Sequence, residues 1–151
     1  MSETAEATRV VMGAVQLGEL ELREFASESD PSVRGAFDFP VHAGTGAAST
    51  SVVYFELEPG ASGPRHTDSA EEILLLLEGT LEVVVDGERA LLSSGGMVVV
   101  PAHRPHAFHN VGRTTARAVG FFSSAAVLHV FQETLQPFGT RAFVSPPLPE
   151  N

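Results

Sequence analysis

The sequence predicts an all-β fold, a sandwich or a barrel of short strands. From residue 51 onward, about eight β-rich segments follow one another at regular spacing, with turn residues between them. The most apolar run, residues 73–77, shows no 3.6-residue periodicity. A helix over residues 71–85 is unfavourable as well, because Gly79 and the β-branched residues after it have low helix propensity. These observations favour strands over helices.

The expected strands end at recognisable turn signals. Pro59-Gly60 ends the first segment, and Asp86-Gly87 is a strong signal for a tight hairpin. Residues 41–51 are rich in Gly, Ala, Ser and Thr and are expected to form a loop. We therefore expect strands at residues 51–58, 72–77, 81–85, 89–92, 97–100, 106–111, 117–122 and 126–131.

The length indicates one domain with an extension at each end. A chain of 151 residues is within the usual size of a single domain and can bury a core without disulfides. We expect residues 1–40 to form an N-terminal appendage packing on the barrel and residues 41–134 to form the barrel. Residues 135–151, which end in a proline-rich stretch, are expected to form a C-terminal extended tail.

The composition excludes several kinds of chemistry. The chain has no cysteine, which excludes disulfides, thiolate metal sites and a cysteine nucleophile. It has no lysine, which excludes Schiff-base chemistry. A formal net charge of -10 disfavours nucleic acids and anionic membranes as partners. The N-terminus is acidic and no run approaches about 20 apolar residues, so we expect no signal peptide, no membrane span and a cytoplasmic location.

Histidines and carboxylates gather at two places in the chain. His66 and Asp68 are two residues apart and share one face of an extended segment, and Glu72 opens the next expected strand. His106 begins a later expected strand and lies within a group of three histidines, His103, His106 and His109. If the strand of His106 lies beside that of His66, imidazoles and carboxylates meet. Two histidines with one or two carboxylates suit divalent Fe, Mn, Ni or Zn.

The spacing of these residues resembles the two motifs of the cupin family. The first motif, G-x5-H-x-H-x3/4-E-x6-G, is matched by Gly60, His66, Asp68, Glu72 and Gly79. The second motif, G-x5-P-x-G-x2-H-x3-N, is matched by Gly95, Pro101, His103, His106 and Asn110. All positions agree except two: Asp68 replaces a histidine and His103 replaces a glycine. The resemblance implies an antiparallel jelly-roll barrel, also called a double-stranded β-helix, in a small single-domain protein.

The resemblance also implies a metal site. It carries His66, Glu72 and His106 over as ligands of one divalent transition metal (Fe, Mn, Ni or Zn). Asp68 stands in the remaining ligand position, where it is a ligand, a hydrogen-bond acceptor for a histidine, or a sign that metal binding is lost. The pair His66-x-Asp68 with a distant His106 also resembles the facial triad of Fe(II)/2-oxoglutarate oxygenases, but Glu72 and the cupin spacing fit the first resemblance better.

The expected function follows from this site. The resemblance implies a metal-dependent oxygenase, such as a quercetinase-like dioxygenase, or an isomerase that acts on a small apolar oxygenated molecule. Glu72 or Asp68 is the candidate catalytic base. Two alternatives stay open: a non-catalytic binding or sensing protein, and a metal-free isomerase that uses His66 and Asp68 as acid and base. Whether the protein is an enzyme at all is left open.

Other histidines and the oligomeric state complete the expectations. His103 is expected in a turn, and His109 is expected to be exposed. His42 and His129 have no partner that the sequence identifies. Because cupins often pair through their sheets, the resemblance implies a homodimer, with a small-molecule substrate as the other partner.

Overall fold

The structure is a computed structural model that describes residues 12–145. Within this range it contains two short 3-10 helices, η1 (Leu17–Glu19) and η2 (Ala43–Thr45). The remaining regular elements are twelve strands: β1 (Arg23–Ser27), β2 (Arg34–Val41), β3 (Ser51–Leu57), β4 (His66–Asp68), β5 (Glu72–Glu78), β6 (Leu81–Val85), β7 (Glu88–Leu92), β8 (Met97–Val100), β9 (His106–Asn110), β10 (Ala116–Phe122), β11 (Val127–Gln136) and β12 (Thr140–Ser145).

The all-β prediction is confirmed, and the eight expected segments are strands β3 and β5 to β11. The turns have the backbone that their residues indicate. Asp86 and Gly87, which join β6 to β7, both have positive φ angles, 53° and 90°, as a tight two-residue hairpin turn requires. Gly79, between β5 and β6, has a φ of 96°, and a Cβ there would lie 3.0 Å from the Cα atom of Ala116. The turn therefore requires glycine for its backbone and for its close packing.

Four strands lie outside the expected ones. β1 and β2 come from the first forty residues, β4 is only three residues long, and β12 comes from the expected tail. β2 crosses the expected boundary at residue 40 and β11 crosses the one at residue 134. The division into appendage, barrel and tail stays a prediction, and residues 146–151 of the tail lie outside the described part of the chain.

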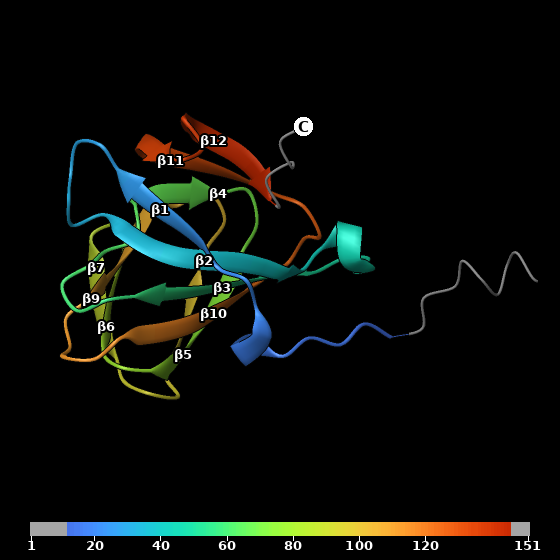
Figure 1. Ribbon diagram of the computed structural model, residues 1–151, viewed down its shortest axis with the longest axis horizontal. Helices are drawn as coiled ribbons and strands as arrows, with labels where there is room; N and C mark the ends of the chain where they lie inside the picture. Colours follow the sequence, from blue (N-terminus) through green and yellow to red (C-terminus); the bar gives the residue numbers. More distant parts are fainter. Residues whose placement is uncertain (1–11, 146–151) are drawn as a thin grey trace, which may run out of the picture.

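The strands form one antiparallel sheet that curls into a nearly closed barrel (Figure 1). The strand order is β7-β6-β9-β4-β11-β1-β2-β3-β10-β5-β8, with β12 paired to β11. The short strand β4 lies between β9 and β11, so it brings together residues that are far apart in the sequence. This central position of β4 determines where the histidines and carboxylates meet.

The inside of the barrel is aromatic and aliphatic. The buried core consists of phenylalanines from β1, β2, β3, β9 and β11, together with leucines such as Leu57, Leu74, Leu76 and Leu81. On the outer face, Val99, Ile73 and Phe121 are cross-strand partners on β8, β5 and β10, with 41–55% of each residue exposed. We call these three residues the outer apolar row. Among residues 12–145, no helix has the length and apolar character needed to cross a membrane.

Candidate metal centre

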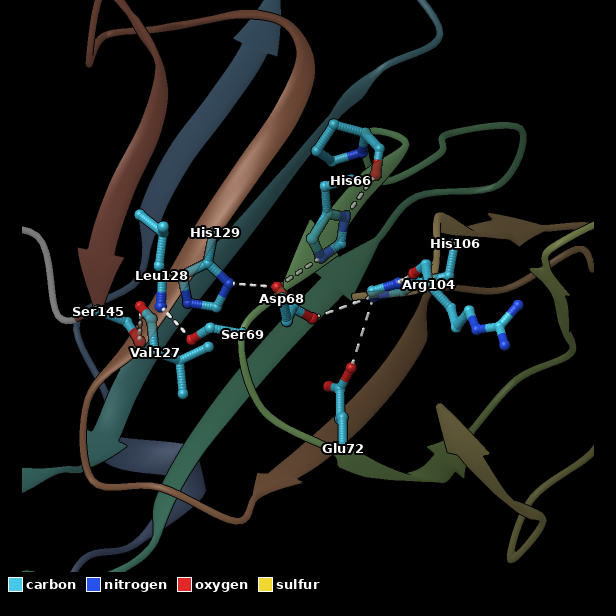
Figure 2. A network of polar contacts seen from close by, with 11 residues as sticks. His66, Asp68, Ser69, Glu72, Arg104, His106, Val127, Leu128, His129 and Ser145 are labelled. Carbon is cyan, nitrogen blue, oxygen red and sulfur yellow. Dashed lines mark hydrogen bonds and ion pairs between the residues drawn. The ribbon is translucent and has the colours of Figure 1, made fainter. Parts of the chain in front are cut away.

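Three neighbouring strands, β4, β9 and β11, and the more distant strand β5 place the candidate site residues inside the barrel. β4 pairs with β9 at His66 and His106, and β4 pairs with β11 at Asp68 and His129. His66 and Asp68 share a face of β4 because side chains alternate along a strand. Glu72 opens β5 and faces the same interior (Figure 2). The structure thus brings together the four residues that the sequence analysis selected.

The polar atoms of these residues gather around the Asp68 carboxylate in two groups. The ligand atoms of His66, Asp68 and His129 lie within 4.8 Å of one another, and so do those of Asp68, Glu72 and His106. Nε2 of His66 lies 3.4 Å from Oδ1 of Asp68, and Nε2 of His106 lies 3.1 Å from Oδ2 of the same carboxylate. Nε2 of His106 also lies 3.8 Å from Oε1 of Glu72. Ligand atoms about 2.1 Å from one ion, at angles between 90° and 109°, are about 3.0–3.4 Å apart. The separations of Asp68 from His66 and from His106 lie in this range, whereas the 3.8 Å separation of His106 from Glu72 is longer.

Backbone carbonyls orient both imidazoles. Nδ1 of His66 donates to the carbonyl of Pro64 at 2.8 Å, and Nδ1 of His106 donates to the carbonyl of Arg104 at 2.9 Å. These bonds place the proton on Nδ1 and leave the lone pair on Nε2, which points into the cluster (Figure 2). Histidines that ligate a metal are typically held in this way by a hydrogen bond from the other ring nitrogen.

Several buried polar atoms of the cluster have no hydrogen-bond partner. In the described part of the chain these atoms are Oδ2 of Asp68, Oε1 of Glu72, Nε2 of His106 and Nε2 of His129. A buried polar atom without a partner costs about 1–3 kcal/mol. Three of these residues, Asp68, Glu72 and His106, form one group whose ligand atoms lie within 4.8 Å of one another, so this group calls for a ligand. A divalent cation would satisfy the two carboxylate oxygens and the His106 nitrogen together. The residues present therefore fit a metal ion.

The cluster shifts the proton affinities of its members in the metal-free protein. Burial raises the pKa of Asp68, but the charge of His66 and the hydrogen bonds of the neighbouring imidazoles outweigh it and hold that pKa well below its usual range. Burial and the charge of Asp68 raise the pKa of Glu72 to about 8, although His106 opposes this. Burial opposes a charge on His66, but Asp68 reverses this and raises the pKa of His66.

Gly120 provides the space that the Glu72 carboxylate occupies. Gly120 lies on β10, which pairs with β5 so that Phe122 faces Glu72 directly. A Cβ atom at position 120 would lie 1.9 Å from Oε2 of Glu72 and 2.9 Å from a methyl carbon of Val53. No side chain other than hydrogen fits there without moving the carboxylate.

A cavity of about 90 Å³ adjoins the cluster inside the barrel. Nine of the ten phenylalanines line it, and its polar side chains are His66, Glu72 and His129. No arginine is among the lining residues. The site therefore combines a polar end with an apolar, aromatic wall.

The remaining sequence expectations have mixed outcomes. His103 is an exposed turn residue with a φ of 65°, as expected. His109 is half-buried rather than fully exposed, because its Nδ1 lies 2.6 Å from the hydroxyl oxygen of Ser62. His42 caps η2 by accepting the N–H of Gly44. His129 is the site residue that sequence reasoning missed: its Nδ1 lies 2.6 Å from Oδ1 of Asp68.

Comparison with known proteins identifies the region that contains the site. Residues 53–122 match the family described as Cupin domain. This region is a cupin domain. It contains His66, Asp68, Glu72 and His106, whereas His129 lies beyond the matched residues.

One curated protein and two solved structures show how far the likeness extends. Quercetin 2,3-dioxygenase from Bacillus subtilis (strain 168) is 37% identical over 73 residues, which are 48% of this chain but only 21% of that protein. The polyketide cyclase RemF from Streptomyces resistomycificus superposes with a TM-score of 0.60 at 21% identity, over 74% of this chain and 79% of that chain. A sugar phosphate isomerase from Acidithiobacillus ferrooxidans ATCC 23270, itself assigned only provisionally, superposes with a TM-score of 0.62 at 14% identity. The superposition covers 93% of this chain and 97% of that chain. At 21% and 14% identity, these two superpositions show that the chains share a fold.

Proposed function

We propose that this cupin domain binds one divalent transition metal and, with it, oxidises a small neutral molecule as a dioxygenase. The observation that carries the proposal is the convergence of buried, unpaired oxygen and nitrogen atoms of Asp68, Glu72 and His106 at the polar end of an apolar cavity. The proposed ligands are His66, Asp68, Glu72 and His106. Fe, Mn or Ni would support the oxidation, whereas Zn fits the donor atoms but has no redox chemistry. The identity to quercetin 2,3-dioxygenase supports the reaction type.

The cavity favours a neutral substrate. Asp68 and Glu72, when both are ionised, cancel the charge of a divalent cation, and no lining residue is an arginine. A carboxylate or phosphate group would therefore find little positive charge to bind. The phenylalanine rings instead favour an apolar molecule, with a hydroxyl or carbonyl group directed at the polar end.

The size of the cavity limits the substrate further. About 90 Å³ is smaller than the roughly 150 Å³ cavity that accommodates benzene in an engineered protein. A molecule of one ring therefore requires small movements of the phenylalanine side chains, and a larger molecule requires greater ones. We accordingly propose a substrate of about one aromatic ring, such as a phenol with neighbouring hydroxyl groups.

The roles of the chain's own residues follow from their positions. When bound, the metal supplies a Lewis acid and a centre that reacts with dioxygen. His66 and His106 hold it through Nε2. A carboxylate oxygen that the ion leaves free, on Glu72 or Asp68, accepts the proton that a substrate hydroxyl loses. The aromatic wall orients the ring and excludes water. A ring-cleaving dioxygenase breaks one carbon–carbon bond of its substrate and adds both atoms of O₂ to the product, so the substrate supplies the electrons and no further reductant is needed.

Metal analysis and oxygen uptake test the proposal. The purified protein, reconstituted separately with Fe²⁺, Mn²⁺, Ni²⁺ and Zn²⁺, is expected to hold about one equivalent of metal. Oxygen consumption is then measured with catechol and quercetin as neutral probes and with oxalate as an anionic one. Oxygen uptake with catechol or quercetin, together with no uptake with oxalate, would support the proposal. Less than about a tenth of an equivalent of every metal would refute it. The double variant of His66→Ala and His106→Ala should lose the metal, whereas His109→Ala should retain it.

A second candidate function is a metal-free binding protein or isomerase. The observation that favours it is that Asp68 already contacts three imidazoles, one of them through a hydrogen bond of 2.6 Å. In that case the raised pKa of His66 gives an ion pair with Asp68 in place of a metal site. Binding of a neutral phenol that is unchanged by a chelator, in protein without metal, would favour this function over the first.

A further inference from the structure

We infer that His129 is a positioning residue of the proposed metal site, which holds the Asp68 carboxylate in its place among the ligands. The inference rests on the proposed metal-binding function and deepens it. His129 lies outside the two motifs and outside the matched cupin region. It places an imidazole next to the position where this chain has aspartate instead of the motif's histidine.

The sheet places His129 directly beside Asp68. The two residues are cross-strand partners on the antiparallel pair β4 and β11, so their side chains project from opposite points on the same face. Nδ1 of His129 lies 2.6 Å from Oδ1 of Asp68. A carboxylate that ligates a metal carries no proton and therefore only accepts hydrogen bonds. The Nδ1–H group of His129 therefore donates this bond.

The contact length separates a positioning role from ligation. Two ligand atoms on one ion are about 3.0–3.4 Å apart, whereas a charge-assisted N–H···O bond is about 2.7–2.9 Å long. The contacts of Asp68 to His66 and His106, at 3.4 and 3.1 Å, belong to the first range. The 2.6 Å contact to His129 is too short for that range and belongs to a hydrogen bond.

The surroundings hold the His129 ring in this orientation. Its centroid lies 5.3–6.3 Å from four phenylalanine rings, and the residue is only 4% exposed. The four are Phe39, Phe122, Phe131 and Phe143. A ring packed in this way has little freedom to rotate. Its hydrogen bond therefore fixes the Asp68 carboxylate, with Oδ1 towards His66 and Oδ2 towards His106 (Figure 2).

Three substitutions of His129 separate the functions of its two nitrogens. His129→Phe keeps the ring shape among the phenylalanines but removes the donor. His129→Asn places an amide N–H near the position of Nδ1. His129→Gln places one near Nε2 instead. His109→Phe is the matched control, because His109 also makes a 2.6 Å contact through Nδ1, but to Ser62 outside the cluster.

The affinities for Zn²⁺ and Co²⁺ are measured by calorimetry, and the visible absorption of the Co²⁺ form reports the ligand set. We expect His129→Phe to weaken binding about 10–100-fold and to alter the Co²⁺ spectrum, as the loss of a residue that supports a ligand does. His129→Asn should recover most of the affinity and the wild-type spectrum, and His129→Gln should not. His109→Phe should bind as wild type does.

Two results would overturn the inference alone while wild type still binds metal. One is a His129→Phe variant with wild-type affinity and spectrum. The other is recovery by His129→Gln but not by His129→Asn, which would assign the role to Nε2. The Asn and Gln variants keep the test decisive if the Phe variant does not fold, as judged by circular dichroism. If wild type binds neither ion, the proposed function fails, and the inference fails with it.

Discussion

Replacing Gly120 with alanine should damage the metal site without touching a proposed ligand. The added methyl group would lie 1.9 Å from Oε2 of Glu72, and an ordinary contact needs about 3.4 Å, so the carboxylate must move by about 1.5 Å. Metal–ligand bonds tolerate deviations of only about 0.2 Å. Val53, at 2.9 Å, closes the other side, so the methyl group cannot be accommodated by the backbone alone.

We expect Gly120→Ala to lower Zn²⁺ affinity by at least about 10-fold, comparable to the loss of a supporting residue. Overpacking a buried site also costs about 1–3 kcal/mol, which corresponds to a fall of roughly 2–12 °C in Tm for a domain of this size. Calorimetric titration with Zn²⁺ and thermal denaturation without metal measure the two effects. Gly18→Ala is the control, because no atom lies within 4 Å of the Cβ it would add. Wild-type affinity and Tm in Gly120→Ala would show that Glu72 is not held where the structure places it.

Three further predictions concern pH, packing and assembly. In the metal-free protein the pKa of Glu72 is raised from 4.5 to about 8, so its protonated form stabilises the fold below pH 4.5 and this stabilisation is lost as the pH rises through about 8. Between pH 5 and pH 9, the free energy of unfolding measured in urea should therefore fall less for Glu72→Gln than for wild type. Phe55→Ala removes the ring stacked on Phe108 at 5.4 Å and should cost about 3–5 kcal/mol in urea unfolding, and a cost below about 1 kcal/mol would contradict the packing. If the outer apolar row joins two copies, light scattering should give about 32 kDa, twice the chain mass of 16.0 kDa, and Phe121→Glu should give the monomer.

Much of the barrel could be predicted from the sequence because its strands carry local signals. Turn residues delimit β3 and β5 to β11, and the apolar residues between them do not repeat at helical spacing. β2 carried a short readable signal too, since Phe37 and Phe39 lie on either side of Asp38. β4 could not be recognised as a strand, because three residues are too few to show any period.

The site could be predicted as far as its residues lie in the two motifs. His66, Asp68, Glu72 and His106 were found from their positions in the two motifs that resemble those of the cupins, and the structure brings them near the Asp68 carboxylate. His129 could not be found in this way. Its proximity to Asp68 depends on the register between β4 and β11, which no local pattern encodes. The space beside Glu72 likewise depends on which strand lies next to β5.

The cluster joins parts of the chain that are distant in sequence; Asp68 and His129, for example, are 61 residues apart. An unfolded chain does not hold such groups together, so an ion that needs them binds the native state alone. At a free concentration a thousand times its Kd, the ion would stabilise the protein by about 4 kcal/mol. This corresponds to a rise of roughly 8–16 °C in Tm. The amount of folded protein in a cell would then follow the supply of the ion.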